Sequence, residues 1–436
     1  MKVTVAGTGY VGLVTGVVLA QIGHNVTCVD VDIKKIEKLK NDISPIYESG
    51  LEELMIKNKD RITYTSDYKS AYKDSDVIFI GVGTPERADG SANLDYVYKV
   101  SQQIAESIKK DTVVVVKSTV PIGTNSQIEK LIRSKIKKDS NVDVVSNPEF
   151  LSQGTAVKDT LYASRIVVGV ESDRASKIME ELYKPLTKEP YNIPYLTMNR
   201  KSAEMVKYAS NDFLALKISY INEIANFCET VGADIKDVTK GMGYDPRIGH
   251  LFLNAGIGYG GSCFPKDTKA LHWLSKELGE ELLTIKAAIE VNKKQKIRLF
   301  DKLMKDYENI NGKNIAVLGL SFKPETDDLR EAPSIENVEL LLDYGANVTV
   351  YDPVAINNFK KIFKDKIEYT SEIEDAIKDK DIALIMTDWE EIVEIDLKKY
   401  ELLMKTPVIY DGRNCYDLEE ISKNNITYIP IGRRQI

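Results

Sequence analysis

The chain has 436 residues, 43% of them hydrophobic and 29% charged, which is the composition of an ordinary globular protein of two or three domains. Its formal net charge of -7 argues against nucleic acid or an anionic membrane as a partner, and no apolar run is long enough to span a membrane. The four cysteines, at positions 28, 228, 263 and 415, are scattered, which predicts free thiols and a cytoplasmic protein. The three histidines form no metal-binding pattern, so we expect no metal site.

The N-terminal stretch follows the pattern of a dinucleotide-binding unit. The sequence predicts a strand (Lys2–Ala6), a glycine-rich turn (Gly7-Thr-Gly-Tyr-Val-Gly12), a helix (Leu13–Ile22) and a second strand (Asn25–Val29). Gly7 would make the tight turn, Gly9 would let a pyrophosphate approach the backbone, and Gly12 would let helix and strand pack closely. Asp30 would accept both ribose hydroxyls and repel a 2′-phosphate, which favours NAD over NADP.

Three later strands each end in a polar loop. The strands are predicted at Asp76–Val82, Val113–Lys117 and Val142–Val145, and the loops are Gly83-Thr-Pro85, Ser118-Thr-Val-Pro121 and Asn147-Pro-Glu-Phe150. Parallel strands end at one edge of a sheet, so we expect these loops to form the rim of a cofactor cleft.

A long helix is predicted next, because Arg200–Val231 contains neither glycine nor proline. Its apolar residues occupy more than one face, so we expect a buried helix that links two domains and forms the core of a homodimer. Lys207 and Asn211, four residues apart, are expected on one face of this helix.

The most informative stretch is Gly256-Ile-Gly-Tyr-Gly-Gly-Ser-Cys-Phe-Pro-Lys-Asp267. Its glycines would let the backbone pass closely around a ligand. Pro265 suits the first position of a helix, predicted over Lys266–Leu278, and this would place Cys263 at a helix N-terminus. The helix dipole there favours the thiolate, which is the nucleophilic form of cysteine. Asp267, one turn further on, would act on a group attached to the sulfur.

The last part of the chain repeats the pattern of the first. The sequence predicts strands at Asn314–Leu318, Asp381–Thr387 and Pro407–Tyr410 and a helix at Ser334–Tyr344, and Gly345–Asp352 corresponds to Gly23–Asp30. Lys323 stands where the phosphate-binding glycines would be, so this copy should bind a nucleotide through charge. The predicted fold class is therefore α/β, with two Rossmann-like doubly wound parallel-sheet domains joined by a long central helix.

Taken together, these residues closely resemble the UDP-glucose/GDP-mannose dehydrogenase family over essentially the whole chain. Besides the stretches above, the matching segments are Asp89-Gly-Ser91, Gly243–Gly249, Phe252–Gly256, Gly319–Pro324 and Asp327–Glu331. Within the family, Tyr244-Asp-Pro-Arg247 and Asp411-Gly-Arg-Asn414 favour UDP-glucose as the substrate. Cys415 departs from the family pattern, in which an apolar residue is usual at this position.

The resemblance implies a four-electron oxidation of UDP-glucose to UDP-glucuronate with two NAD and one water. Cys263 would trap the intermediate aldehyde as a thiohemiacetal and then carry a thioester, which water hydrolyses. Lys207 and Asn211 would stabilise the oxyanions, and Asp267 would orient or deprotonate the water. Thr119 and Glu149 are further candidates for proton handling.

The resemblance also assigns binding residues and domains. Besides the three glycines and Asp30, it gives NAD the residues Val11, Lys35, Thr84, Thr119, Lys266 and Arg330. It gives the UDP-sugar the residues Glu149, Phe150, Leu151, Lys207, Asn211, Phe252, Leu253, Asn254, Ala255, Gly256, Gly260, Lys323 and Arg413, with Arg247 reaching across the dimer interface. The expected domains are residues 1–198 for NAD, 199–300 for dimerisation and the cysteine loop, and 301–436 for the UDP-sugar.

Other functions stay open on the sequence alone. GDP-mannose and UDP-N-acetylhexosamines are the alternative substrates within the family. A two-electron hydroxyacid dehydrogenase also pairs a Rossmann domain with a Lys-xxx-Asn helix, but it needs no cysteine and leaves the third domain unexplained. A non-catalytic nucleotide sensor would normally have lost Cys263 or Lys207. The yield of NADH per substrate, two, one or none, separates these classes.

Overall fold

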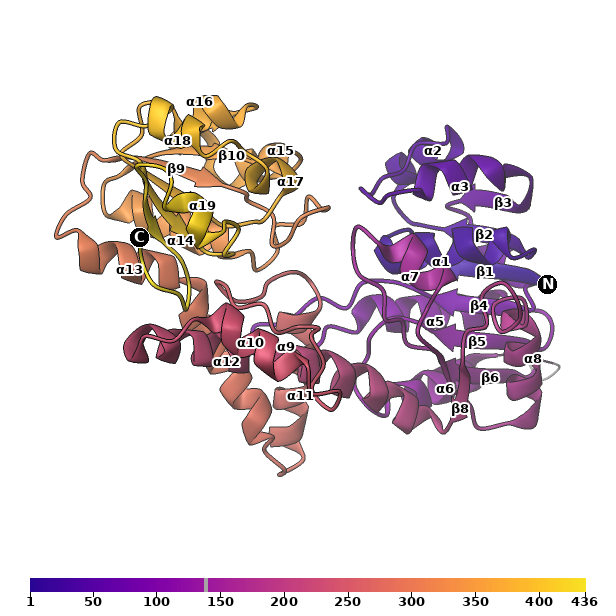
Figure 1. Ribbon diagram of the computed structural model, residues 1–436. Helices are drawn as coiled ribbons and strands as arrows, with labels where there is room; N and C mark the ends of the chain where they lie inside the picture. The colour runs from indigo at the N-terminus through magenta and orange to yellow at the C-terminus, as the bar shows by residue number, and fades with distance from the viewer. Residues whose placement is uncertain (137–139) are drawn as a thin grey trace. The chain divides into compact units, whose positions relative to one another are not determined.

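The computed structural model of the chain describes residues 1–136 and 140–436. The chain divides into two compact units, Met1–Ser210 (unit 1) and Asn211–Ile436 (unit 2). Helix α9 (Arg200–Val231) runs without a break from the one unit into the other (Figure 1). Its bounds are those predicted, because none of its 32 residues is a glycine or a proline that would end a helix.

Unit 1 is built on an eight-stranded sheet in the order β3-β2-β1-β4-β5-β6-β7-β8. Its strands are β1 (Lys2–Ala6), β2 (Asn25–Val29), β3 (Ile62–Thr65), β4 (Val77–Ile80), β5 (Thr112–Val116), β6 (Val142–Ser146), β7 (Ile166–Gly169) and β8 (Tyr195–Met198). The first six are parallel, whereas β7 meets β6 antiparallel through the single pair Ser146 and Gly169. Strands β3, β7 and β8 were not predicted.

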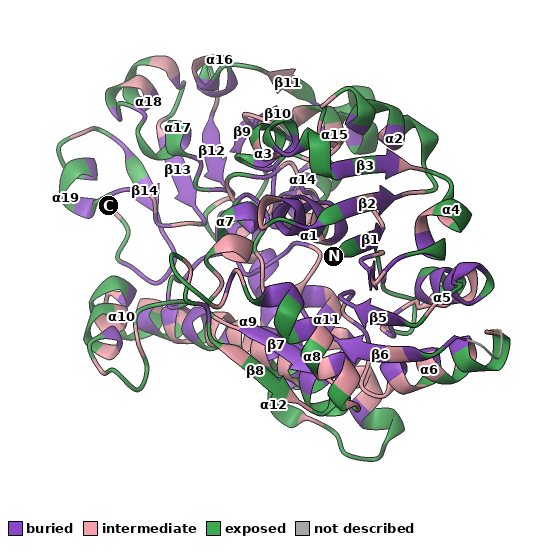
Figure 2. Cartoon of the chain, turned by 90° about the vertical axis from the view of Figure 1, so that its right-hand side faces the viewer, coloured by how far each residue is buried: buried purple, intermediate pink, exposed green. Residues whose placement is uncertain are grey.

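Helices cover both faces of this sheet, as the apolar strands require. One face packs against α1 (Tyr10–Gln21), α2 (Ile33–Lys40), α3 (Leu51–Lys57), α7 (Ala156–Leu161) and α8 (Asp173–Tyr183). The other face packs against α4 (Tyr68–Lys73), α5 (Asp95–Ser107) and α6 (Thr124–Lys135). Figure 2 shows the central strands buried and the outer sides of these helices exposed.

Unit 2 contains a second sheet, in the order β11-β10-β9-β12-β13-β14 and parallel throughout. Its strands are β9 (Asn314–Leu318), β10 (Asn347–Tyr351), β11 (Glu368–Thr370), β12 (Ile382–Ile385), β13 (Val408–Asp411) and β14 (Thr427–Ile429). This order matches the first six strands of unit 1 and is that of a dinucleotide-binding fold. The prediction of two Rossmann-like domains joined by a long helix is therefore confirmed.

Helices cover both faces of the sheet of unit 2, and three further helices follow α9 in the chain. One face of the sheet packs against α13 (Arg298–Asp306), α14 (Pro333–Asp343) and α15 (Ile356–Phe363). The other face packs against α16 (Ile373–Ile377), α18 (Lys398–Leu403) and α19 (Leu418–Ile421). The helices α10 (Ile235–Gly243), α11 (Phe264–Glu277) and α12 (Leu283–Lys296) come between α9 and this sheet in the chain.

Within the single chain, α9 is buried on one side and exposed on another. Phe213, Tyr220 and Phe227 are 61%, 51% and 63% exposed, while Ile221 and Ala225 on another side of the helix are fully buried. A helix with apolar residues on several faces thus leaves one apolar stripe uncovered. None of the helices among the described residues has the length and apolar character that crossing a membrane requires.

Candidate active site

The turn between β1 and α1 has room for a phosphate beside its middle glycine. Gly7 has a φ of 100°, and a Cβ there would lie 2.7 Å from Gly81 O. A Cβ on Gly12 would lie 2.0 Å from Gly7 O, so close backbone packing requires both of these glycines. A Cβ on Gly9 would meet no atom within 4 Å. The open side of Gly9, at the N-terminus of α1, therefore fits the pyrophosphate of NAD.

Asp30 follows β2 and is held as an anion. Thr8 N and Thr8 Oγ1 donate to its Oδ2 at 2.9 and 2.6 Å, and Asp32 N donates to its Oδ1 at 3.0 Å. Burial by itself would raise the pKa of Asp30, but these hydrogen bonds and the charge of Lys35 bring it below the ordinary value. A half-exposed carboxylate at this place fits ribose hydroxyls. Of the other residues predicted to bind NAD, Val11 lies on α1 and Lys35 on α2.

The loops after β4 and β5 are joined at one edge of the sheet, as predicted. Thr84 Oγ1 donates to Thr119 O at 2.9 Å. Glu204, near the start of α9, accepts hydrogen bonds from Gly123 N at 2.6 Å and Asn125 N at 2.9 Å. These bonds fix the start of α6 and with it the loop that carries Thr119.

Lys207 lies in a buried ion pair with the loop that follows β6. Its Nζ is 2.9 Å from Glu149 Oε1, and the two side chains are only 4% and 6% exposed. Leu151 N donates to Glu149 Oε2 at 2.8 Å. The Phe150 ring lies 5.6 Å from Lys207 Nζ and 3.9 Å from Arg165 Cζ. The structure thus brings together four predicted residues of unit 1, namely Glu149, Phe150, Leu151 and Lys207.

The sequence analysis missed a second lysine in this cluster. Lys117 follows β5, is buried, and donates from Nζ to Asn147 Oδ1 at 3.1 Å. Burial lowers the pKa of Lys117 to about 8, while the charge of Glu149 opposes this shift and that of Lys207 adds to it. A lysine placed directly after four consecutive valines at the end of a strand was the signal that could have identified it.

Cys263 lies at a helix N-terminus, as predicted. It is the N-cap residue of α11, which begins at Phe264, two residues before the predicted start, and has Pro265 in its first turn. The thiol is half-buried, and its Sγ lies 3.7 Å from Ser262 Oγ. The helix dipole favours the thiolate here. At Cys415, by contrast, burial raises the pKa well above its ordinary value, so that thiol stays protonated.

Asp267 is buried one turn after Cys263. Its backbone N donates to Cys263 O at 2.8 Å, and its carboxylate pairs with Lys266 Nζ. Asn211 Nδ2 donates to Asp267 Oδ2 at 2.7 Å. One N–H of the amide that was predicted to stabilise an oxyanion is therefore used to hold Asp267.

Two glycines of the cysteine loop are closely packed against other residues of unit 2. A Cβ on Gly260 would lie 2.4 Å from Glu331 O, and a Cβ on Gly258 would lie 2.6 Å from Asn292 Oδ1. Both glycines are therefore required by close packing against other parts of unit 2.

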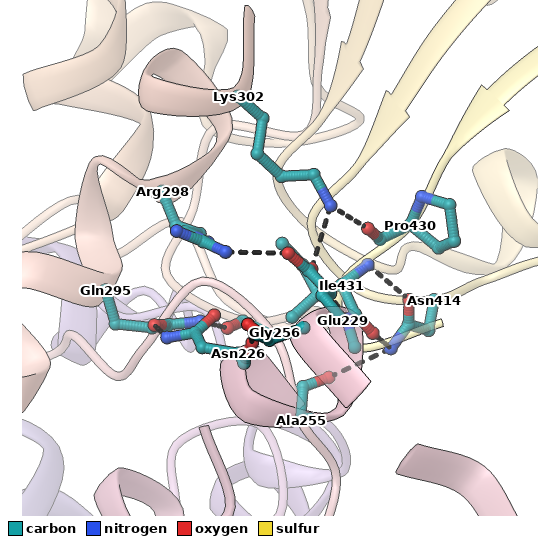
Figure 3. A network of polar contacts seen from close by, with 12 residues as sticks. Asn226, Glu229, Ala255, Gly256, Gln295, Arg298, Lys302, Asn414, Pro430 and Ile431 are labelled. Atoms are coloured by element: carbon teal, nitrogen blue, oxygen red, sulfur yellow. Dashed lines mark hydrogen bonds and ion pairs between the residues drawn. The ribbon is translucent and has the colours of Figure 1, made fainter. Parts of the chain in front are cut away.

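The predicted substrate loop 252–256 is held at its end by buried amides. Asn222 Oδ1 accepts from Gly256 N at 2.8 Å, and Gln295 Nε2 donates to Gly256 O at 2.6 Å. Asn414 Nδ2 lies 3.5 Å from Ala255 O (Figure 3). Both the N–H and the C=O of Gly256 are thus hydrogen-bonded. Phe252 and Asn254, which precede it in the loop, are exposed.

Three arginines were predicted to bind ligands, Arg247 and Arg413 the UDP-sugar and Arg330 the NAD. Arg413 Nε donates to Met386 O at 2.8 Å, and its two terminal nitrogens lie 3.3 Å from Gly258 O and Phe322 O. It therefore ties the cysteine loop to the segment that carries Lys323. Arg330 pairs with Asp328, and Arg247 pairs with Asp245 while 87% of its side chain is exposed.

Within residues 1–136 and 140–436, no group of three or more His, Cys, Asp or Glu side chains is placed to hold a metal ion. The chain thus has a dinucleotide-binding sheet, a second sheet of the same order, and a thiol at a helix N-terminus. Together they are features of an NAD-dependent dehydrogenase. Sequence models of the UDP-glucose/GDP-mannose dehydrogenase family match the chain in three places. They are the NAD binding domain at residues 1–187, the central domain at 201–294 and the UDP binding domain at 316–418. The chain belongs to this family.

Known relatives match the chain over its length. UDP-glucose 6-dehydrogenase YwqF of Bacillus subtilis is 48% identical over 438 residues, covering 100% of this chain and 98% of the relative. UDP-glucose 6-dehydrogenase of Rhizobium meliloti is 44% identical, covering 99% and 100%. A solved UDP-glucose dehydrogenase from the archaeon Pyrobaculum islandicum superposes with a TM-score of 0.92 at 35% identity, covering 99% of this chain and 98% of its own.

Proposed function

We propose that the protein oxidises UDP-glucose at C6 to UDP-glucuronate, with two NAD and one water. Membership of the family supports this proposal, as do the names of relatives at 44% and 48% identity. The observation that carries it at the level of residues is Cys263 at the N-terminus of α11, with the buried Asp267 one turn further on. A dehydrogenase that stops at the aldehyde has no need of such a nucleophile.

The oxidation proceeds through a covalent adduct of the sugar with Cys263. The turn 7–12 and Asp30 would hold NAD, which would supply the hydride acceptor for each of the two oxidations at C6. The Cys263 thiolate adds to the aldehyde carbon, and loss of the second hydride leaves a thioester on Sγ. Water adds to the thioester carbon and gives a proton to Asp267, and cleavage of the C–S bond returns the thiolate and releases the carboxylate.

The buried ion pair of unit 1 supplies the charge for these steps. Lys207 provides a positive charge in a site shielded from water, where it stabilises developing negative oxygen more strongly than in solvent. We assign the proton that the alcohol loses in the first oxidation to Glu149 and Thr119. Asn211 keeps Asp267 in place with one N–H and has a second N–H for a substrate oxygen.

The remaining assignments follow the family. We assign NAD binding to residues 1–198, with Val11, Lys35, Thr84, Lys266 and Arg330 as further contacts. Residues 199–300 dimerise and carry the catalytic cysteine. Residues 301–436 bind the UDP-sugar, with Lys323 and Arg413 as contacts beside Gly260 and the loop 252–256. We place the reaction in the cytoplasm, where the four free thiols remain reduced.

The substrate and the cysteine are tested together by counting NADH. Purified enzyme with limiting UDP-glucose should form two NADH per sugar, and GDP-mannose and UDP-N-acetylglucosamine should react far more slowly. Cys263→Ser should abolish turnover and leave UDP-glucose binding nearly intact. Cys415→Ser is the matched control and should keep its activity, since that thiol is protonated. Two NADH per sugar from Cys263→Ser would exclude the covalent route.

The role of Asp267 is tested by trapping the adduct. If Asp267 serves the attacking water, Asp267→Asn should accumulate the thioester on Cys263, visible as a sugar-nucleotide adduct in intact-mass spectrometry. Lys207→Ala should instead slow both hydride transfers by about 10²–10³-fold. An Asp267→Asn enzyme that forms neither adduct nor NADH would assign Asp267 to the alcohol step instead.

The exposed stripe of α9 supports a homodimer. Phe213, Tyr220 and Phe227 are spaced by seven residues, which aligns them along one side of the helix, where a second copy can pack its own stripe. Arg247 would then reach the sugar nucleotide of the other subunit. Phe227→Glu should shift the protein to monomers in light scattering. Leu402→Glu, on an apolar residue of α18 that is 79% exposed, should leave the assembly unchanged. A dimer retained by Phe227→Glu would place the interface elsewhere.

A further inference from the structure

One buried carboxyl group of unit 2 has no part in the proposed chemistry. Asp212 follows Asn211 on α9 and is only 1% exposed. Among the described residues, no hydrogen-bond partner lies within reach of either of its carboxylate oxygens. Buried carboxylates are normally paired, because taking an unpaired charge out of water is costly. A neutral acid in this place costs much less.

A second carboxyl group acts on Asp212 from α11. Asp267 is equally buried, but it pairs with Lys266 and accepts a hydrogen bond from Asn211 Nδ2. Two neighbouring carboxylates cannot both ionise without strong repulsion. Of this pair, the surroundings stabilise Asp267 as the anion.

We propose that Asp212 is a positioning residue for Asp267: it stays a neutral carboxylic acid in the working enzyme, so that the negative charge of this buried pair rests on Asp267. The inference rests on the proposed function, in which Asp267 serves the water that hydrolyses the thioester. A second negative charge at Asp212 would oppose every step that builds negative charge on a substrate oxygen.

The groups that face Asp212 come from the cysteine loop and from α11. Burial, followed by the charge of Asp267, raises the pKa of Asp212 to about 8. Burial likewise raises the pKa of Tyr259, in the cysteine loop, to about 12, so this phenol stays neutral. Lys266, also on α11, is bound to Asp267. Asp212 therefore gains its charge in the mildly alkaline range and loses its proton to solvent.

The protonation of Asp212 can be measured without an activity assay, through the pH dependence of the stability of the fold. An unfolded chain ionises an aspartate near pH 4, whereas the folded chain keeps the proton of Asp212 up to about pH 8. Folding takes up a proton between these values, so stability falls as the pH rises through this range. Asp212→Asn cannot ionise and removes this slope. The Tm of the unaltered chain should therefore fall relative to that of Asp212→Asn between pH 5 and pH 8.5.

The matched control is Glu223→Gln, which removes an exposed carboxylate from the same helix. Its Tm should follow that of the unaltered chain at every pH. Asp212→Glu keeps an ionisable group and should retain a falling Tm.

The action on Asp267 is measured by the pH dependence of kcat, from NADH formation at saturating UDP-glucose and NAD. Loss of one proton with a pKa near 8 should lower kcat by up to about tenfold between pH 7 and pH 9. In Asp212→Asn the ratio of kcat at pH 9 to kcat at pH 7 should be several-fold higher than in the unaltered enzyme. Asp212→Glu should restore the fall, and Glu223→Gln should keep the original ratio.

Three results would overturn the proposal, and only the third would also refute the proposed function. Parallel Tm curves for the unaltered chain and Asp212→Asn would show that Asp212 does not hold a proton. A pH-dependent Tm difference with equal kcat ratios would show that the proton has no effect on Asp267. Absence of NADH from UDP-glucose in every variant would refute the proposed function and the positioning role, while the Tm curves would still report on the proton.

Discussion

The two Rossmann-like sheets have the same frame but differ where their second strands end. In unit 1, Gly7 N donates to Val29 O at 2.8 Å, and in unit 2, Gly319 N donates to Tyr351 O at 2.8 Å. Each bond joins the turn after the first strand to the last residue of the second strand. The two sheets therefore share their strand order and also this hydrogen bond between the first turn and the second strand.

The aspartate that follows the second strand differs between the two sheets in its exposure and in its hydrogen-bond donors. Asp30 is half-exposed and accepts hydrogen bonds from Thr8 and Asp32. Asp352 is buried and saturated, with donors at 2.7 to 3.1 Å from the backbones of Leu320, Ser321, Val354 and Ala355 and from Trp389 Nε1. Asp30 is therefore accessible to a ligand, whereas Asp352 accepts these hydrogen bonds from its own unit and stabilises the turn there.

The two turns lead into different segments of chain. After Gly7, helix α1 begins at Tyr10, so its N-terminus lies beside the turn. After Gly319, helix α14 begins only at Pro333, and the intervening loop carries Lys323. A shared frame thus specifies the sheet, whereas the loop chemistry decides what each sheet can bind.

The largest expected effect comes from adding a methyl group to each turn. In Gly319→Ala, the residue has a φ of 83° and its Cβ would lie 2.5 Å from Thr387 Cβ and 2.7 Å from Thr387 N. We expect a loss of about 4 kcal/mol in the free energy of unfolding. In Gly9→Ala, φ is -82° and no atom is near, so stability should change by about 1 kcal/mol or less. Urea unfolding measures both.

The same pair separates packing from binding. A Cβ on Gly9 occupies space that the pyrophosphate needs, so Gly9→Ala should raise the KM for NAD by about tenfold or more. Equal losses of stability in the two variants would show that Gly9 is packed as closely as Gly319, and the contrast between these two glycines would fail.

A smaller difference is expected between the two aspartates. Asp352→Ala leaves several buried donors without an acceptor and should cost about 3 kcal/mol. Asp30→Ala should cost about 1 kcal/mol, because only three donors lose their acceptor and the half-exposed site lies next to solvent. Its main effect should be on the coenzyme, with lower kcat/KM for NAD and a higher ratio of NADP to NAD use. Steady-state kinetics with both coenzymes measure this, and an unchanged ratio would remove Asp30 from the ribose.

Local patterns made much of this molecule predictable. Gly7, Gly12 and Asp30 act within one strand-turn-helix unit, and Cys263 and Asp267 lie within one helical turn, so their placement follows from short-range geometry. The bounds of α9 follow from the absence of helix-breaking residues.

Long-range packing decided the rest. The sequence indicates an aspartate at 352 but does not show that Trp389 donates to it. The sequence does not show that Lys117 and Asp212 are buried, because their burial depends on strands and helices that are distant in the chain. Burial is what shifts the pKa of both side chains. The sequence predicts that α9 is buried but does not show which of its apolar faces packs against the same chain. The structure shows that the face with Phe213, Tyr220 and Phe227 is exposed in the single chain.

The smallest expected effect concerns the hydroxyl that prepares Asp30 for its ligand. Thr8 is fully buried, and its Oγ1 donates to Asp30 Oδ2 at 2.6 Å. In Thr8→Val this bond is lost while the backbone bond from residue 8 remains. The expected cost at pH 7 is about 1 kcal/mol in the free energy of unfolding. In unit 2 the hydroxyl bond to the aspartate is longer, with Ser321 Oγ 3.3 Å from Asp352 Oδ2, and backbone N–H groups and Trp389 Nε1 supply further donors.

The pH dependence identifies the charge as the cause. The folded pKa of Asp30 lies below the ordinary value, so the stabilisation is present above the unfolded pKa of about 4 and is lost as the pH falls through the folded pKa. The cost of Thr8→Val should therefore shrink below pH 4. Thr15→Val is the matched control, since Thr15 Oγ1 donates at 2.6 Å to the neutral Val11 O, and its cost should not change with pH. If urea unfolding at pH 7 and pH 3.5 shows the same constant cost for both variants, Thr8 does not keep Asp30 ionised.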